Sequence, residues 1–224
     1  DGFIINPAPG HETENMLKKE CGNKPYLLIA DSLAVKEGET ASPTIQPDYL
    51  EIGRRLGEQL KTKEQKIGII ADWKMSEAVQ AEISGLTEVL EGSGSEISWC
   101  IYRRKEQNIT ERMKEETKAD ALVILDPGVL EEFGEQAEHG KYKGAELYGV
   151  GYSLKTVALL DKGNIQGLVV PDGYEIGYKS VKEIAGKIEH KFYKMQGYTT
   201  EYQIFSKKDF SMDDDLERFL YSYE

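Results

Sequence analysis

Several carboxylates and aromatic rings in this 224-residue chain come within two positions of the end of an apolar run. These residues are Asp31, Trp73, Asp126, Tyr152 and Asp172. Where strands and helices alternate, residues just past the strand ends face the crevice in which ligands bind. Ionised carboxylates there accept hydrogen bonds, and aromatic rings offer a flat apolar face. The pattern therefore indicates a binding site for a small molecule.

Residue types used in catalysis show no recognisable spacing. The histidines, His11, His139 and His190, lie far apart and form neither a metal site nor a catalytic triad by sequence. The segment 149–151 (GVG) lacks the third glycine and the acidic residue of a dinucleotide site, and the chain has no GxSxG or P-loop motif. We therefore expect no enzyme, no metal site and no cofactor.

Composition narrows the possible partners. The net charge of −12 argues against nucleic acid, because phosphate binding needs clustered lysines and arginines. No apolar run approaches the roughly 18–20 residues that span a bilayer. Hydrophobic residues make up 39% of the chain, which suffices for the core of one large or two modest domains.

The stretch 145–178 shows how the strand ends are positioned. An apolar run at 147–150 stops at Gly151, and Leu154, Val157 and Leu160 then recur at helical spacing. A second, β-branched run covers 165–170. A strand, a helix and a strand in this order need a right-handed crossover, and so predict a parallel sheet.

The rest of the chain repeats this alternation, with Asp48 and Ser76 placed as N-caps of two helices. Apolar runs predict further strands at 3–6, 26–30, 44–45, 66–71, 97–102, 121–125 and 202–205. Helical patterns predict helices at 12–20, 110–118 and 130–139, after Asp48, Ser76 and Pro171, and from Ser211 onward.

Taken together, the segments DGFIINPA, LLIADS, IQPDYLEIG, KIGIIA and ALVILD resemble the sugar-binding branch of the type I periplasmic binding proteins. Their fold is shared with the effector domains of the lac-repressor family. The segment LDKGNIQGLVVPDGYEIGY is the most specific match, and the resemblance covers nearly the whole chain.

The resemblance implies an α/β fold of two Rossmann-like lobes with parallel sheets, joined by a three-crossing hinge that closes on a ligand. Residues 1–48 and 172–198 would form an incomplete first lobe, and 49–171 the second. The tail, 199–224, would cross back between the lobes and end in a closing helix. Because the family starts two βα units earlier, the chain is interpreted as truncated at its N-terminus.

Sugar sites in this family combine an aromatic platform with carboxylates and amides, often with one arginine. The ligand-binding residues expected by this transfer are Pro7, Asp31, Asp48, Trp73, Glu82, Asp126, Tyr152 and Asp172. Simpler interpretations stay open for three of them. Trp73 could pack in a core between the lobes, Asp48 could only cap a helix, and Asp126 could only form a turn.

Three positions depart from the family pattern. Glu82 stands where an arginine is common, Gly151 where an aspartate is common, and Pro171 where a polar amide is common. Either the ligand differs and carries an amine that Glu82 could pair with, or the pocket is degenerate. The alternative for Glu82 is an ordinary solvated residue on a helix.

These observations favour an extracytoplasmic solute-binding protein, located in the periplasm or anchored as a lipoprotein at the cell surface. It would deliver a sugar or sugar-like ligand, neutral or amine-bearing, to a membrane permease or a sensor kinase. The first alternative is the effector domain of a lac-repressor-family transcription regulator, and the second is an enzyme on the same fold.

Overall fold

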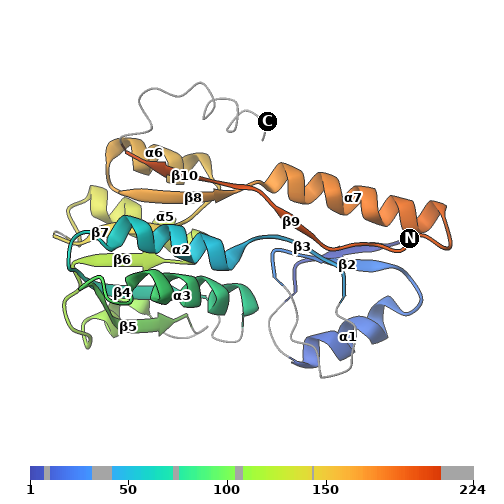
Figure 1. The fold of residues 1–224 in the computed structure, drawn as a ribbon, viewed down its shortest axis with the longest axis horizontal. Coiled ribbons are helices and arrows are strands. Elements are labelled where there is room, and N and C mark those ends of the chain that lie inside the picture. Colours follow the sequence, from blue (N-terminus) through green and yellow to red (C-terminus); the bar gives the residue numbers. More distant parts are fainter. Residues whose placement is uncertain (8–10, 32–41, 73–75, 104–107, 143, 208–224) are drawn as a thin grey trace.

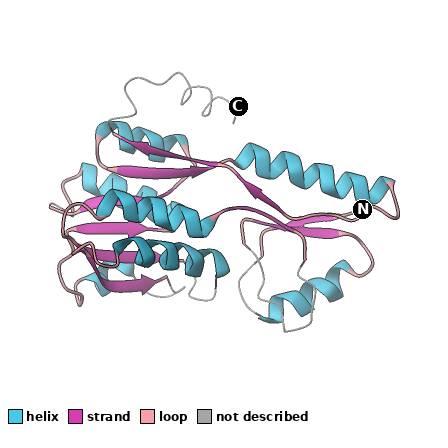
Figure 2. Ribbon diagram, in the orientation of Figure 1, coloured by secondary structure: helices cyan, strands magenta, loops and turns pink. Residues whose placement is uncertain are grey.

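The structure is a computed structural model that describes residues 1–7, 11–31, 42–72, 76–103, 108–142 and 144–207. The chain folds around two separate β-sheets that lie end to end, each with helices packed on both faces (Figures 1 and 2). Trp73 and the helix expected from Ser211 onward fall outside the described residues. Among the helices that are described, none is long and apolar enough to cross a membrane.

The described part of the first sheet has four parallel strands in the order β1-β2-β3-β9. Its strands are β1 (Phe3–Ile5), β2 (Tyr26–Ile29), β3 (Thr44–Pro47) and β9 (Tyr198–Thr200). Helix α1 (His11–Cys21) packs on one face through Leu17, and helix α7 (Gly173–Glu189) covers the other through Ile184. Both helices lie against apolar strand residues, as alternation along each strand requires.

The second sheet has six described strands, in the order β10-β8-β7-β6-β4-β5. Its strands are β4 (Lys66–Ala71), β5 (Glu96–Tyr102), β6 (Ala121–Ile124), β7 (Glu146–Val150), β8 (Gly167–Pro171) and β10 (Tyr202–Ser206). All neighbours pair in parallel except β10, which runs antiparallel to β8. The central strands are buried on both faces, which explains why β6 reads as an uninterrupted apolar run.

Five of the described helices cover the second sheet. They are α2 (Tyr49–Leu60), α3 (Glu77–Leu90), α4 (Ile109–Met113), α5 (Pro127–Glu138) and α6 (Leu154–Lys162). Helices α2 and α3 share a core on one face, and α4, α5 and α6 share a core on the other. This sandwich of helices on a parallel sheet follows from the βα alternation of the sequence.

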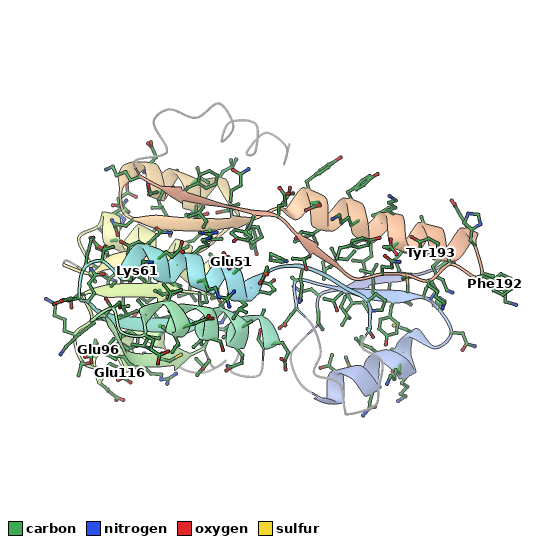
Figure 3. The ribbon with its side chains drawn as sticks, viewed as in Figure 1. Glu51, Lys61, Glu96, Glu116, Phe192 and Tyr193 are labelled. Carbon is green, nitrogen blue, oxygen red and sulfur yellow. The ribbon has the colours of Figure 1, made fainter. Side chains whose placement is uncertain are left out.

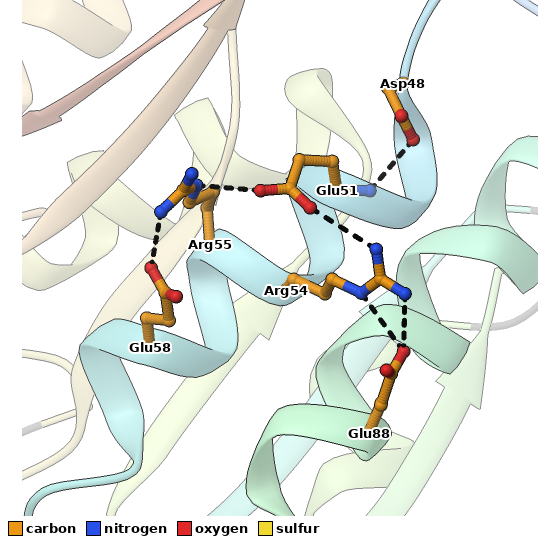
Figure 4. Close-up of polar contacts among 6 residues, drawn as sticks. All are labelled: Asp48, Glu51, Arg54, Arg55, Glu58 and Glu88. Carbon is orange, nitrogen blue, oxygen red and sulfur yellow. Dashed lines mark hydrogen bonds and ion pairs between the residues drawn. The ribbon is translucent and has the colours of Figure 1, made fainter.

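Helices α2 and α3 lie unusually close together because two glycines stand at their crossing. A Cβ atom on Gly53 would collide with the carbonyl oxygen of Glu82, and one on Gly85 would collide with that of Leu50. Outside this crossing, Arg54 bridges Glu51 on its own helix and Glu88 on α3 (Figure 4). These ion pairs are exposed, so solvent screening and side-chain entropy keep their contribution to stability small.

Within the described residues, three chain crossings join the sheets, at β3 to α2, β8 to α7, and β9 to β10. The last two are tied together, because the Asp172 amide donates to the Glu201 carbonyl at 3.0 Å. The Glu201 amide in turn donates to the Glu175 carboxylate at 2.9 Å. The expected architecture of two parallel α/β lobes joined by three crossings is therefore confirmed, whereas the exact lobe boundaries stay a prediction.

The chain that follows α7 is fixed back onto that helix by a buried carboxylate. Glu183 accepts hydrogen bonds from the Tyr193 hydroxyl at 2.8 Å, the Tyr198 hydroxyl at 3.0 Å and the Gln196 amide at 2.8 Å. Tyr193 and the exposed Phe192 mark the end of the molecule farthest from the second sheet (Figure 3). Glu183 thus aligns β9 beside β3.

Two expectations about elements differ from the structure, and a third stays open. The helix expected at 110–118 ends at Met113, because the following charged residues offer no apolar side chain to pack on the sheet. Strand β9 is absent from the predicted strands, since its sequence YTT is short and polar. Strand β1 pairs only with β2 among the described strands, so the interpretation as a truncated lobe stays a prediction.

Candidate functional site

The candidate site lies where the carboxyl ends of the parallel strands of both sheets face each other. Asp31 comes two residues after β2 in the first sheet, and Ser76 begins α3 after β4 in the second. In open α/β sheets this edge is the ligand-binding edge. Two groups of polar side chains meet there, one around Asp31 and one around Arg103.

The Asp31 carboxylate reaches from the first sheet to the N-terminus of α3. It accepts a hydrogen bond from the Ser76 hydroxyl at 2.7 Å and another from the Ala78 amide at 3.1 Å. The Ser76 hydroxyl itself accepts from the Val79 amide at 3.1 Å, as the N-cap of α3. Asp31 is buried. Asp31, which is expected to lie between the lobes, therefore contacts the second lobe through Ser76 and Ala78.

Tyr49, in the first turn of α2, lies in the same group. Its hydroxyl donates to the Ala30 carbonyl, which ties α2 to the residue before Asp31. Burial raises the pKa of Tyr49 far above its ordinary value, and the carboxylates of Glu82 and Asp31 raise it further. The phenol therefore stays neutral and acts as a hydrogen-bond donor.

Glu82 is the third carboxyl or phenol group in this cluster and is only 3% exposed. Burial raises the pKa of Glu82 well above its ordinary value, and the negative charge of Asp31 raises it further. The interpretation of Glu82 as a solvated helix residue is wrong. The physical reason is the glycine crossing, which brings the backbone of α2 onto α3 at this position.

The second group joins three strand ends of the second sheet around Arg103, directly after β5. Its guanidinium makes ion pairs with Asp72 after β4 and with Asp126 after β6, both at 3.0 Å. Asp126 is buried and also caps α5 by accepting from the Val129 amide at 2.9 Å. Asp126 thus caps a helix and also pairs with Arg103 at the carboxyl ends of the strands, the edge where ligand-binding residues are expected.

The remaining predicted residues have separate surroundings. Asp48 caps α2 by accepting from the Glu51 amide at 3.0 Å, and Asp172 caps α7 by accepting from the Glu175 amide at 2.8 Å. Tyr152 follows β7 and is 64% exposed, while Pro7 follows β1 and is buried. The structure therefore brings Asp31 and Glu82 together, while Asp48 and Asp172 each cap a helix.

Gly151, one of the departures from the family pattern, has a packing reason. A Cβ atom there would lie 3.0 Å from Cγ2 of Thr156 and 3.1 Å from Cδ1 of Leu168. Thr156 also completes a capping box with Ser153 at the start of α6. An aspartate at position 151 would therefore press on the first turn of α6.

Sequence reasoning missed Tyr49, Ser76 as a partner of Asp31, and Arg103. Arg103 could have been found, because it follows the apolar run 97–102 as directly as Asp126 follows its own strand. In the part of the chain that the structure describes, no three His, Cys, Asp or Glu side chains are arranged to hold a metal ion. The assembled groups can donate and accept hydrogen bonds and can present charge.

No protein-family model and no curated protein matches the chain by sequence. Solved structures do match. A carbohydrate transporter solute-binding protein from Agrobacterium radiobacter, in complex with D-arabinose, is 19% identical with a TM-score of 0.80, over 98% of this chain and 78% of that one. GanP, a glucose-galactose binding protein from Geobacillus stearothermophilus, is 20% identical with a TM-score of 0.76, over 95% and 78%.

A transcriptional regulator, LacI, from Bacillus cereus subsp. cytotoxis also matches, at 14% identity and a TM-score of 0.72 over 92% of this chain and 74% of that one. Binding proteins and a regulator thus share one architecture with this chain. At these identities the likeness shows the fold alone. The fold is that of the type I periplasmic binding proteins, as the sequence motifs predicted.

Proposed function

We propose that the chain is an extracytoplasmic solute-binding protein that captures a sugar-like small molecule between its two lobes. The observation that carries this proposal is the meeting of two parallel-sheet edges across the buried carboxyl groups of Asp31 and Glu82 and the partly buried phenol of Tyr49. Solved proteins of the same fold are described with D-arabinose and as glucose-galactose binding, which supports a carbohydrate as the ligand class.

The ligand would be held by side chains from both sheets. We assign Asp31, Glu82, Asp126 and Asp172 as acceptors for hydroxyl groups, and Trp73 and Tyr152 as aromatic faces. Pro7 and Asp48 would line the same edge. Arg103 is added to this set because its guanidinium lies between two strand-end carboxylates, where it can donate to a ligand.

The ligand is proposed to be neutral or to carry an amine. Glu82 occupies the position of a hydrogen-bond donor in the sugar-binding family and offers no cation. As a protonated acid it donates one hydrogen bond, and beside an amine it can ionise and pair with it. Closure of the three-crossing hinge would then enclose the ligand and present both lobes to a membrane permease or a sensor.

The alternative is the ligand-sensing domain of a transcription regulator, which the match to the LacI structure supports. The net charge of −12 favours the transport function, because it opposes contact with DNA. The gene sequence upstream of Asp1 distinguishes the two. A lipobox or apolar anchor supports an extracytoplasmic lipoprotein, and a basic helix-turn-helix supports a regulator.

A thermal-shift screen with monosaccharides, oligosaccharides, nucleosides and polyamines tests the proposed function. A ligand at 100 times its dissociation constant adds about 2.7 kcal/mol to the free energy of unfolding, so it raises Tm by several degrees. We expect at least one monosaccharide to do so. We expect Asp126→Asn to raise the dissociation constant of that ligand about tenfold, because the charge paired with Arg103 and one acceptor oxygen are lost while asparagine can still cap α5.

Asp161→Asn is the matched control, since Asp161 is an exposed carboxylate on α6 away from both sheet edges. It should leave the ligand response unchanged. Stabilisation by nucleosides alone, or equal loss of response in both variants, would contradict the proposed sugar site.

A further inference from the structure

The N-terminus of α3 holds a carboxylate that comes from the other lobe. The helix is 14 residues long, and its own N-cap, Ser76, satisfies the amide of Val79. Asp31 accepts a hydrogen bond from the amide of Ala78 and another from the hydroxyl of Ser76. The first turn is therefore capped twice, once locally and once across the gap between the sheets.

A carboxylate is well suited to this place. The first four amides of a helix lack partners within the helix, and the helix dipole concentrates positive charge there. Hydrogen bonds to an ionised group are stronger than bonds between neutral groups. Because Asp31 is only 8% exposed, water and salt screen these bonds weakly.

The backbone beside Asp31 is held in an uncommon conformation. Ala30 has a φ of 63°, in the left-handed region that non-glycine residues rarely adopt. Its carbonyl accepts the Tyr49 hydroxyl, and its amide donates to the Ile45 carbonyl at 3.2 Å. Such a conformation persists only where the surroundings maintain it, and here bonds on both sides direct Asp31 towards α3.

We propose that Asp31 is an interlobe latch: a tethered anion that occupies the N-terminus of α3 and holds the two lobes together. A ligand that enters between β2 and α3 competes with Asp31 for the hydrogen-bond donors of Ser76 and Ala78. Anionic ligand groups are excluded from this helix end because a carboxylate already fills it. The latch does not depend on the proposed sugar ligand.

The distance between two spin labels tests the latch directly. Labels on Lys19→Cys of α1 and Thr87→Cys of α3 report the separation of the lobes, with Cys21→Ala and Cys100→Ala as background. Both labelled positions are exposed, and the two helices belong to different lobes (Figure 1). Without ligand, we expect one narrow distance distribution for the latched protein. Asp31→Ala should raise the population of longer distances about tenfold or more, since two charge-assisted hydrogen bonds are lost.

Asp31→Asn keeps the shape of the side chain and one acceptor oxygen but removes the charge, so it should give an intermediate population. Asp72→Ala is the control, because it removes a carboxylate at a neighbouring strand end whose ion pair with Arg103 stays within the second lobe. It should leave the distances unchanged. The latch is wrong if Asp31→Ala matches the parent distribution, or if Asp72→Ala changes it equally. If Asp31→Ala does not fold, Asp31→Asn takes its place: the latch is wrong if Asp31→Asn matches the parent distribution, or if Asp72→Ala changes it equally.

Discussion

At the scale of single residues, Glu82 is a carboxyl group that folding removes from water. Burial favours its neutral form, and the nearby charge of Asp31 acts in the same direction. The folded state therefore holds the Glu82 proton more tightly than the unfolded chain does. Stability must then decline as pH rises from the unfolded pKa to the folded pKa, because ionisation is easier in the unfolded chain.

We predict that Glu82→Gln removes this decline. Urea unfolding at pH 5 and pH 8 should show that the variant gains stability relative to the parent at the higher pH. The gain amounts to about 1.4 kcal/mol for each unit by which folding raises the pKa, within the measured interval. Glu88→Gln, an exposed carboxylate on the same helix, should shift stability by less than about 1 kcal/mol at both pH values. If the difference in stability between the parent and Glu82→Gln does not change with pH, the assignment is contradicted.

Part of the candidate site could be predicted from single residues and part could not. Asp31 and Asp126 are predictable at the ligand edge because each closely follows an apolar run that is a strand. The partners of Asp31 lie 45 and 47 positions away, and no local pattern announces such a contact. The burial of Glu82 could not be predicted either, because it follows from glycines on two helices that meet only in the folded chain.

At the scale of elements, β1 is a strand that pairs with β2 on one side and has no described strand on the other. Its residues Phe3 and Ile4 are 38% and 41% exposed. An apolar strand edge with free backbone groups is a template for pairing with another chain. Charged residues on such an edge oppose that pairing.

We therefore predict that Ile4→Lys lowers self-association of this chain at high protein concentration, as measured by sedimentation velocity or light scattering. Met16→Lys is the matched control, because Met16 is an exposed apolar residue on α1 rather than on a strand edge. It should change self-association less than Ile4→Lys does. Equal effects of the two substitutions would indicate general surface hydrophobicity instead of edge pairing.

The order of strands and helices was largely predictable, because buried parallel strands appear as short apolar runs between helical patterns. The order of strands within each sheet was not, since it depends on pairing between distant segments. Strand β9 shows the limit most clearly. Its sequence, YTT, contains residues common in strands but is too short to show an apolar pattern. The strand forms where the chain from Tyr193 to Tyr198 is bound to Glu183 beside β3.

At the scale of the whole molecule, two sources of negative charge and one missing cation act on any ligand. The chain carries a net charge of −12, Asp31 already fills the anion-favouring end of α3, and the arginine of the family pattern is replaced by Glu82. Arg103 is the cationic side chain at the described strand ends, and two carboxylates already pair with it. The combined field disfavours an anionic ligand, although salt weakens its long-range part.

We predict that titration calorimetry will rank glucose and glucosamine above glucuronate, with a difference of at least about tenfold in dissociation constant. The physical reason is that the glucuronate carboxylate would be desolvated beside carboxyl groups without gaining a free cation. Glucosamine should gain further on Glu82 because its ammonium group favours ionisation of that acid, and Glu82→Gln should remove this preference for glucosamine over glucose. Raising the salt concentration should reduce the difference in dissociation constant between glucuronate and the other two sugars, since screening reduces the repulsion. Binding of glucuronate as tight as that of glucose would show that the site holds a free cation that faces the ligand.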